Sequence, residues 1–437
     1  MSMNLIDRIC HLAIAPRTLT EEELSEALLA FEDTMAVAFA GWHEPVTQAL
    51  LSVYSGGEVE LIDGSTTTTV EHAAFIHAVA GHVLDYDDVH LISVTHPSVV
   101  LVPAILSLIG LRPELKSRAL PAYAVGLAVN IALGRVLGFS HYDRGWHATS
   151  TIGALAGAAA TAHFLGLDED GVRNALALAA PQAGGLQQNF GTMAKSVQAG
   201  YAAAAAVRAG LMSEAGISGA RDIIGSRGFI DLYQGKEQGE NLDNVPIQIE
   251  VDTLSRKLYP CCYLTHRMIA AALSAREQLG GIIPDGAKIE VKVPFGTMRP
   301  LHILDPHTGL EAKFCGTYTI ATALAQGSVG LSDFENDSVM RPEIRRLMQQ
   351  IRISEKPMTS QVQVGIGHGV VEIGIHTGEE WCAEASVVHY PGSPGSPLNE
   401  SQVSTKIDDC LTLYSRRAGV SLRAELFRSD LRTRLGF

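Results

Sequence analysis

The sequence is poor in cysteine and in charged residues, and each shortage excludes a class of protein. The six cysteines among 437 residues form no CxxC pair and no even framework, so a disulfide scaffold is excluded. Cys261 and Cys262 are adjacent, where a disulfide would be strained, and we expect reduced thiols in a cytoplasmic protein. Acidic residues outnumber basic ones by 47 to 33, which argues against a nucleic acid or an anionic membrane as partner.

The chain also lacks a long uninterrupted apolar run. Its beginning carries the early charges Asp7 and Arg8 and too short an apolar run for a signal peptide. The most apolar stretch, 123–139, is broken by Asn130 and Arg135 and falls short of a membrane span, so we expect it to form a core helix. No P-loop, dinucleotide fingerprint, HExxH or GxSxG motif is present.

Apolar residues make up 46% of the sequence, which indicates a globular fold. In the first 262 residues they recur at helical spacing, and Thr20 with Glu23 matches a capping box. Acidic residues 168–170 are typical of a further helix start. The expected helices are 24–41, 71–83, 99–108, 121–138 and 150–165.

The pattern changes after this helical part. Residues 288–294 alternate as a strand does, and 361–366 and 369–375 alternate similarly. Residues 341–351 have helical spacing between these strands. We therefore predict a mainly α protein in which a large all-helical domain is accompanied by a smaller α+β domain. The predicted boundaries are 1–265, joined by 398–437, for the large domain and 266–397 for the smaller one.

One polar stretch, LDYDDVHLISVTHPS, stands between two apolar helical segments. It contains Asp85, Asp87, Asp88, His90 and His96. Burying such groups is costly unless they are paired or used, so a catalytic site is the first hypothesis. The carboxylates could instead cap helices or sit on a solvated loop. They could also bind a divalent cation, because carboxylates and imidazole are suitable ligands.

Three further stretches carry chemistry. His147 lies between a tryptophan and a hydroxyl cluster in GWHATSTIG, where a structural, hydrogen-bonded histidine is also common. Lys195 is the only charged side chain between residues 173 and 208, and such an amine either reaches the surface or is kept for an anion. Lys257, in KLYPCCYLTH, stands with His266 at the predicted domain boundary, where ligand sites often form.

Five motifs in this order resemble the MmgE/PrpD family: LDYDDVH with THPS, GWHATSTIG, NFGTMAKSVQAG, KLYPCCYLTH and EAKFCGTY. That family includes 2-methylcitrate dehydratases, aconitate decarboxylases and an iminodisuccinate epimerase. The resemblance spans nearly the whole chain. It implies a helical main domain with a smaller α+β domain, a homodimer, no metal or organic cofactor, and an active site in the cleft between the domains.

The resemblance also implies roles for individual residues. His96 is similar to the family's proton donor or acceptor at a substrate carbon, with Asp85 in the same motif. Lys195 and His147 complete the implied catalytic set. The resemblance implies that both of them also bind carboxylate groups of the substrate. The implied substrate-binding residues are Lys257, His266, Thr95 and, from the smaller domain, Tyr318.

The chain departs from the family pattern at two positions that bear on the substrate. Val89 stands where many members have threonine, and Cys315 stands where serine is usual. The missing hydroxyl at position 89 removes one potential contact with the substrate.

The resemblance, together with the two isolated lysines, implies a cofactor-independent lyase that acts on a small di- or tricarboxylic acid. Decarboxylation of an aconitate and dehydration of a citrate-type acid both pass through negative charge next to a carboxylate, which needs cations and a proton shuttle. An epimerase of an iminodisuccinate-like acid is the alternative in the same fold. A metal-dependent hydrolase or lyase that uses the DxDD stretch, and a catalytically idle anion-binding protein, are the alternatives from other classes.

Overall fold

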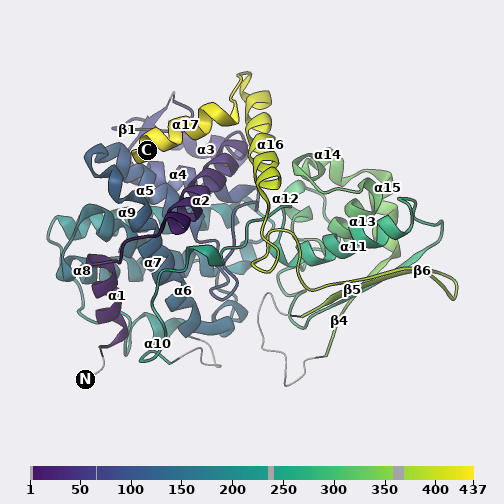
Figure 1. Cartoon of the computed structure of the whole chain (residues 1–437), viewed down its shortest axis with the longest axis horizontal. Helices are drawn as coiled ribbons and strands as arrows, with labels where there is room; N and C mark the ends of the chain where they lie inside the picture. Colours follow the sequence, from purple (N-terminus) through teal and green to yellow (C-terminus); the bar gives the residue numbers. More distant parts are fainter. Residues whose placement is uncertain (1–2, 65, 235–240, 358–368) are drawn as a thin grey trace.

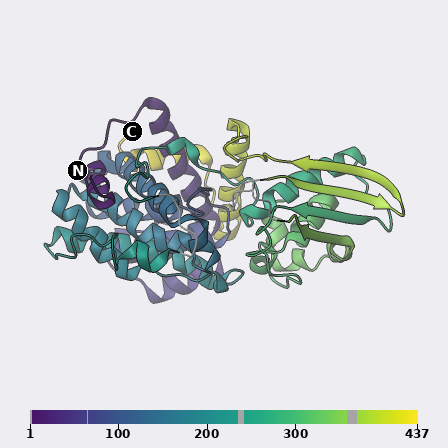
Figure 2. The ribbon, with the colours of Figure 1, turned by 90° about the horizontal axis from the view of Figure 1, so that it is seen from below.

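The computed structural model describes residues 3–64, 66–234, 241–357 and 369–437. Helices fill one lobe, and a sheet with its covering helices forms the other (Figure 1). Turned by 90°, the molecule is elongated, with the sheet extending away from the helical lobe (Figure 2). The predicted fold class, a large helical domain with a smaller α+β domain, is therefore confirmed.

The large domain is built from helices whose starts were visible in the sequence. Thr20 and Glu23 form the expected capping box of α2, and Asp168 caps α8 by accepting from the Gly171 amide. A two-stranded ribbon, β1 (Val59–Glu60) with β2 (Thr67–Thr68), precedes α4. The helices of this domain are α1 Leu5–Ile14, α2 Glu21–Ala40, α3 Pro45–Val53, α4 Val70–Val83, α5 Ser98–Leu111, α6 Ala119–Asp143, α7 Ala148–Leu165, α8 Glu169–Ala179, α9 Met193–Glu214 and α10 Phe229–Tyr233.

Small residues let the central helices of this domain approach closely. A Cβ placed on Gly157 of α7 would lie 2.6 Å from the Cβ of Ala206 on α9, and a Cβ on Gly200 of α9 would lie 2.4 Å from the Phe75 ring on α4. Larger side chains would force these helices apart. The close packing of α4, α7 and α9 brings the end of α4 next to the start of α9, where the candidate site lies.

Helix α6 is the long apolar helix that the sequence predicted at 121–138. By length and composition the helical stretch Pro113–Asp143 could cross a membrane, but 83% of its most apolar window is buried inside the protein. Gly138, with φ 62°, introduces a kink near its end. The helix is surrounded by its own domain, as expected for a core helix.

The smaller domain contains a four-stranded mixed sheet in the order β4-β3-β5-β6. Strand β3 pairs in parallel with β4 and antiparallel with β5, and the predictions at 288–294, 341–351 and 369–375 are confirmed by β3, α15 and β5. The predicted strand 361–366 lies outside the described residues. Strands β4 and β6 were not predicted. The elements are α11 His266–Gln278, β3 Lys288–Val293, α12 Gly309–Ala312, α13 Gly316–Gln326, α14 Asn336–Val339, α15 Pro342–Gln350, β4 Ile351–Glu355, β5 Val371–Thr377 and β6 Glu380–Val387.

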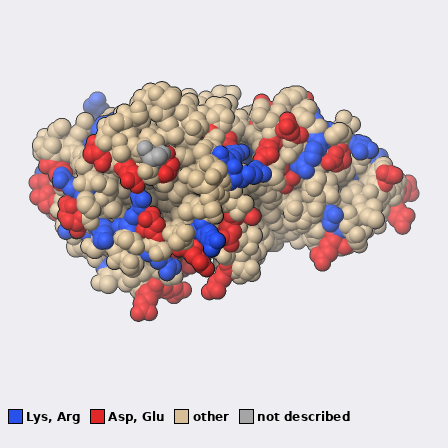
Figure 3. All heavy atoms as spheres, turned by 90° about the horizontal axis from the view of Figure 1, so that it is seen from above, with Lys and Arg blue, Asp and Glu red and all other residues tan. Residues whose placement is uncertain are grey.

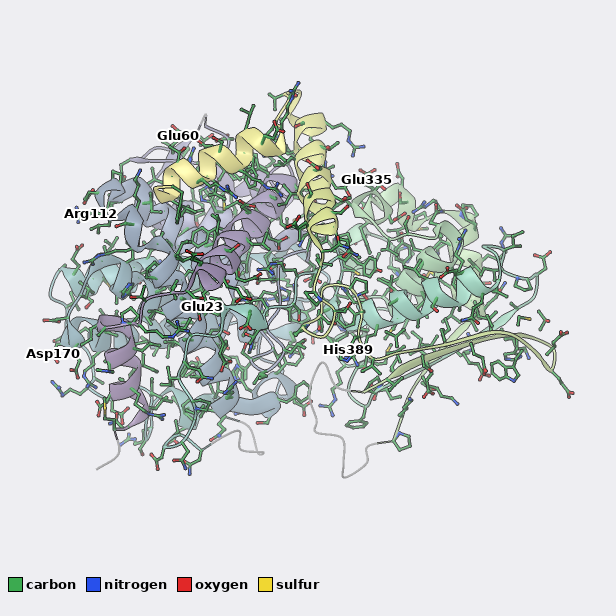
Figure 4. The ribbon with its side chains drawn as sticks, viewed as in Figure 1. Glu23, Glu60, Arg112, Asp170, Glu335 and His389 are labelled. Carbon is green, nitrogen blue, oxygen red and sulfur yellow. The ribbon has the colours of Figure 1, made fainter. Side chains whose placement is uncertain are left out.

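The chain then returns to the helical lobe as α16 (Glu400–Ala418) and α17 (Ala424–Leu435). The ammonium group of Lys406 on α16 is buried and lies 2.7 Å from Oδ1 of Asp33 on α2. Nearer the end of α16, Arg416 pairs with Glu335 of the smaller domain at 2.9 Å, at the position labelled in Figure 4. Helix α16 therefore contacts both lobes beside their boundary.

The outer surface carries mixed charge. On the face shown in Figure 3, acidic and basic side chains of the described residues alternate, and no continuous basic area covers that face. Since opposite charges lie close together, their fields partly cancel. Cations that could bind an anionic ligand also lie buried inside the molecule, and these are described next.

Candidate functional site

The polar stretch 84–98 connects α4 to α5 at the boundary between the lobes. Asp85 adopts a left-handed conformation with φ 52°, which is uncommon for a residue other than glycine but more accessible to aspartate. Two backbone hydrogen bonds, of 2.8 and 2.7 Å, join Val89 to Ser255. Lys406 also donates to the backbone carbonyl of Tyr86 at 2.9 Å. The stretch is thus held at several points, and its side chains are fixed relative to one another.

Lys195 lies in the first turn of α9, and its side chain reaches the end of α4. Its Nζ lies 2.5 Å from Oδ1 of Asp85 and 3.0 Å from Nε2 of His82. The same ammonium group lies 5.5 Å from the centre of the Phe190 ring and 5.4 Å from that of Phe314. Phe190 belongs to the large domain and Phe314 to the smaller one, so Lys195 lies where the two domains meet.

Lys257 approaches Asp85 from the opposite side. Its Nζ donates to the backbone carbonyl of Asp85 at 2.8 Å and lies 3.0 Å from Oδ2 of the same residue. Burial alone would raise the pKa of Asp85, but the two ammonium groups of Lys195 and Lys257 hold that pKa well below its usual range. Asp85 is therefore an ionised carboxylate shared by two buried lysines.

Asp87 is the second carboxylate of the cluster and is shared by two imidazole rings. Its Oδ2 lies 2.7 Å from Nδ1 of His82 and 3.1 Å from Nδ1 of His96. Because Nε2 of His82 accepts from the Lys195 ammonium, the ring proton of His82 is on Nδ1 and is donated to Asp87. The groups form a chain in the order Lys195, His82, Asp87, His96.

The histidine rings of this chain are neutral in the free protein. Burial lowers the pKa of His82, and it lowers the pKa of His96 to about 4 although Asp87 opposes that shift. Burial would raise the pKa of Asp87, but attraction to both rings and their hydrogen bonds keep it well below the usual range. The ring of His96 is 15% exposed, whereas that of His82 is fully buried. His96 is therefore the more accessible of the two rings.

His147 lies beside this series of hydrogen-bonded side chains, and its two ring nitrogens make no hydrogen bond among the described residues. Its ring stacks on that of His82 at 5.5 Å and meets Phe190 edge to face at 5.2 Å. Neither ring nitrogen has a hydrogen-bond partner among the described residues, although both are buried. Burial first, and then His82 and Lys195, lower the pKa of His147 well below its ordinary value. Buried polar atoms are rarely left unpaired, so a polar ligand could satisfy this ring.

A small cavity opens among these groups. Its volume is about 10 Å³. The large domain contributes the catalytic candidates Asp85 and Lys195, and the smaller domain contributes Lys313. The full lining is His82, Val83, Asp85, Gly191, Thr192, Lys195, Ser196, Leu310, Lys313 and Phe314. The cavity therefore lies between the two lobes, as the resemblance implied.

The structure brings Asp85, His96, His147, Lys195 and Lys257 together, as the sequence analysis expected. Their chemical roles stay predictions.

Three other predicted site residues take different positions. Tyr318 is fully buried and its hydroxyl donates to the Asp333 carbonyl, so the hydroxyl is already engaged inside the smaller domain. Thr95 donates to Oδ1 of Asn130 at 2.7 Å and fixes the loop rather than the ligand. His266 is fully buried, with Nε2 3.3 Å from the Cys261 carbonyl.

The polar stretch itself divides into two parts. Asp88 accepts from the Ser98 hydroxyl and amide, and burial raises the pKa of Asp88 to about 7. Nδ1 of His90 lies 2.9 Å from Oγ of Ser93. These contacts secure the loop and the start of α5. The capping hypothesis is therefore correct for Asp88, and the site hypothesis fits Asp85 and Asp87.

The two departures from the family pattern are both buried. Val89 is 4% exposed and takes part in the backbone bridge to Ser255. The Sγ of Cys315 lies 3.2 Å from Oγ1 of Thr317, within its own helix start. Neither side chain lines the cavity.

Sequence reasoning missed two site residues and the aromatic pair beside them. His82 was counted as part of a helix, although it stands three residues before Asp85 and joins the carboxylate of Asp87 to Lys195. Lys313 was quoted only as part of the EAKFCGTY motif. Phe190 and Phe314 lie 5.4 Å apart across the domain boundary. The short spacing of His82 before the DxDD stretch was the one available signal.

His82, Asp85, Asp87 and His96 each offer a ligand atom, and these atoms lie within 4.8 Å of one another. Two imidazoles and two carboxylates are a usable set for a divalent metal. However, ammonium groups occupy both oxygens of Asp85, and both nitrogens of His82 are engaged. A metal ion would have to displace two buried cations, so the groups present fit an anion better than a cation.

The chain is similar to known proteins along most of its length. The profile of the MmgE/PrpD N-terminal domain matches residues 10–241, and that of the MmgE/PrpD C-terminal domain matches residues 259–426. Three relatives are named cis-aconitate decarboxylase. The mouse protein is 27% identical over 74% of this chain and 70% of its own length. The Aspergillus terreus protein is 25% identical over 98% and 96%, and the human protein is 24% identical over 78% and 74%. Both halves of the chain thus match one family, and the chain belongs to the MmgE/PrpD family.

Proposed function

We propose that this protein is a cofactor-independent lyase that decarboxylates a small unsaturated tricarboxylate of the cis-aconitate type. The observation that carries the proposal is the buried cluster around Asp85 and Asp87, in which two ammonium groups and three imidazole rings meet at the domain boundary. Relatives that match nearly the whole chain or most of it are named cis-aconitate decarboxylases. The donor set suits an anion and a proton transfer.

The reaction requires one proton and releases one carbon dioxide. The bond between the CH₂ carbon and its carboxylate breaks, and its electron pair forms a new double bond to the central carbon. The electron pair of the former double bond takes a proton at the vinyl carbon. A trianion thereby becomes the dianion methylenesuccinate (itaconate), and both atoms and charge balance.

His96 is the residue that we assign to deliver this proton. Its Nδ1 lies 3.1 Å from Asp87, and its Nε2 makes no hydrogen bond among the described residues, so Nε2 is free to face the vinyl carbon. Burial lowers the pKa of His96 to about 4 in the free protein. A trianion beside the ring favours the imidazolium form, and ionised Asp87 stabilises it.

Lys195 and Lys257 are assigned to the carboxylates of the substrate. An ammonium group has three N–H donors. Lys195 uses two of them, on Asp85 and His82, and Lys257 faces only Asp85. Each lysine therefore keeps a donor for a substrate oxygen. Fixed ammonium groups in a water-poor site stabilise the negative charge that builds up as the C–C bond breaks.

The test is proton NMR of the purified protein in deuterated buffer, with cis-aconitate, trans-aconitate, citrate, 2-methylcitrate and iminodisuccinate in separate tubes. The proposal expects vinyl signals of methylenesuccinate from cis-aconitate. An aconitate-type product from citrate or 2-methylcitrate would identify a dehydratase instead. Deuterium entry with inverted configuration and no loss of water or carbon dioxide would identify an epimerase. No change in any tube would contradict all three lyase and isomerase assignments.

A further inference from the structure

Four lysines among the described residues are buried, and one of them differs from the rest. Lys195, Lys257 and Lys406 each lie within 3.0 Å of an aspartate oxygen. No carboxylate of the described residues lies within 4.0 Å of the Nζ of Lys313, which is 2% exposed. A buried charge is costly unless it is paired, so Lys313 is the ammonium group that lacks its anion.

The surroundings of Lys313 satisfy only part of its donor capacity. Its Nζ donates to the backbone carbonyl of Pro260 at 2.7 Å and lies 4.4 Å from the centre of the Phe334 ring. Of three N–H donors, one therefore has an oxygen acceptor among the described residues. The remaining capacity suits an acceptor brought by a ligand.

Lys313 also lies between two cavities. It lines the small cavity beside Asp85 and Lys195, and it lines a second cavity of about 260 Å³. Leu310 is shared by both linings in the same way. The larger cavity lies between α16 and the smaller domain, close to Glu335 as labelled in Figure 4. A carboxylate bound in the larger cavity would therefore lie beside the same lysine that lines the cavity of the catalytic cluster.

The acidic groups of the larger cavity do not neutralise Lys313. Glu44 pairs with Arg417 at 2.6 Å, and Glu335 pairs with Arg416 at 2.9 Å. His43 also lines this cavity. The arginines of α16 thus occupy both carboxylates, and an arriving anion would not have to compete with them for Lys313.

We propose that Lys313 binds a carboxylate group of the substrate from the side of the smaller domain, as the third cation of the site after Lys195 and Lys257. This inference rests on the proposed function, because it takes the ligand to be a small polycarboxylate. It makes the smaller domain part of the binding site, with Lys313 in the position that the sequence analysis gave to Tyr318.

A measurable proton uptake follows from this placement. Burial lowers the pKa of Lys313 to about 8, so the amine is about one quarter protonated at pH 8.5. A carboxylate at its Nζ favours the charged form and raises that pKa. Binding at pH 8.5 should therefore take up a large part of one proton from the buffer.

Other groups near Lys313 do not titrate in this range. Burial raises the pKa of the Cys261 thiol to about 12, and it stays protonated. Burial lowers the pKa of His43, which stays neutral above pH 8. Glu44 pairs with Arg417. The lysines beside Asp85 hold its pKa well below the usual range, and Lys257, beside Asp85, has its pKa raised. His96 starts from a pKa of about 4, far enough below 8.5 that a neighbouring anion leaves the ring mainly neutral at this pH. Lys313 is thus the group near the ligand whose charge changes at pH 8.5.

The experiment is titration calorimetry of the full chain with propane-1,2,3-tricarboxylate, a saturated probe that has no double bond to rearrange. It is run at pH 8.5 in two buffers of unlike ionisation enthalpy, so that the difference in heat gives the protons taken up. Lys313→Met should lower affinity about tenfold to a hundredfold, as expected for a lost charge-assisted hydrogen bond, and should abolish the uptake. Lys313→Arg keeps its charge at this pH and should bind without uptake. Lys292→Met, on the exposed side of β3, is the matched control.

If a variant fails to fold, the proton uptake of the wild-type protein still tests the inference. Binding with uptake that is lost in Lys313→Met and kept in Lys292→Met supports the inference. Binding without proton uptake, or uptake unchanged in Lys313→Met, overturns it and leaves the proposed function standing. If wild-type protein binds no tricarboxylate at all, the proposed function fails, and the role of Lys313 fails with it.

Discussion

Lys257 holds Asp85 at two points, with its Nζ 2.8 Å from the backbone carbonyl and 3.0 Å from Oδ2 of the same residue. This double contact fixes a residue whose φ of 52° is uncommon, and such conformations persist where surrounding contacts determine them. Asp85 therefore presents Oδ1 to Lys195 in one defined position. The two lysines and the carboxylate act as one rigid unit at the centre of the site.

Replacing Asp85 by asparagine should show how much the ion pairs of Lys195 and Lys257 with Asp85 contribute to the stability of the protein. Asparagine keeps the shape and tolerates a positive φ, but it leaves two buried ammonium groups without a counter-charge. We expect a loss of about 3–5 kcal/mol in the free energy of unfolding, measured by urea denaturation. Asp285→Asn, at an exposed position, is the control. A loss below about 1 kcal/mol would show that the ion pairs contribute little.

Lys406 should stabilise the stretch 84–98, because its ammonium group contacts both Asp33 and the backbone of Tyr86. Lys406→Met leaves Asp33 as an unpaired buried charge and removes the donor to the Tyr86 carbonyl. We expect a cost of about 3–5 kcal/mol and a lower kcat. The double variant Lys406→Met/Asp33→Asn should recover part of the stability but not the kcat, because the Tyr86 contact stays absent. Equal stability of the single and double variants would contradict this explanation.

Acid should destabilise the protein through its buried neutral histidines. Burial, followed by the charge of Arg135, lowers the pKa of His90 to about 3, whereas in the unfolded chain it is about 6.5. The unfolded state therefore binds the proton more readily, and stability present above pH 6.5 is lost as the pH falls toward 3. Between pH 7.5 and 5, His90→Gln should lose about 2 kcal/mol less than wild type in urea denaturation. Equal losses of stability in wild type and in His90→Gln would mean that His90 is not buried in the neutral form.

Removing metal ions with a chelator tests whether the cluster around Asp85 binds an anion or a metal ion. Since ammonium groups occupy the oxygens of Asp85, dialysis against EDTA should leave turnover of cis-aconitate unchanged. An untreated sample carried through the same dialysis is the control. Activity that disappears with EDTA and returns with magnesium or zinc would instead favour a metal-dependent hydrolase or lyase that uses His82, Asp85, Asp87 and His96.

Local patterns predicted the fold well because they depend on neighbouring residues. The Thr20 capping box and the alternation of 288–294 are satisfied within a few residues of chain. Strand β6 was missed because Glu380–Val387 carries charges on an edge strand, where the alternation is weak. The strand predicted at 361–366 lies outside the described residues.

The site was predictable only in part, because its contacts join distant segments. Lys195 stood out as an isolated amine, but its partners Asp85 and His82 lie more than one hundred positions earlier. His82 looked like an ordinary helix residue until α4 and α9 were seen to meet. Tyr318 was placed at the pocket by resemblance, and the structure instead turns its hydroxyl to Asp333. Lys313 differs from the other buried lysines of the described residues in having no carboxylate partner, a property that no local sequence pattern indicates.

The central claim is that His96 delivers the proton during decarboxylation of a cis-aconitate-type acid. His96→Asn is the sharpest variant, because its amide can replace Nδ1 beside Asp87 but offers nothing in place of Nε2. The control is His302→Asn, at an exposed position. The measurement is proton NMR of cis-aconitate turnover in deuterated buffer. We predict that wild type and His302→Asn yield methylenesuccinate with one deuterium on its saturated carbon, and that His96→Asn is slower by about 10²- to 10⁴-fold. Formation of the same deuterated product by His96→Asn at the wild-type rate would contradict the account.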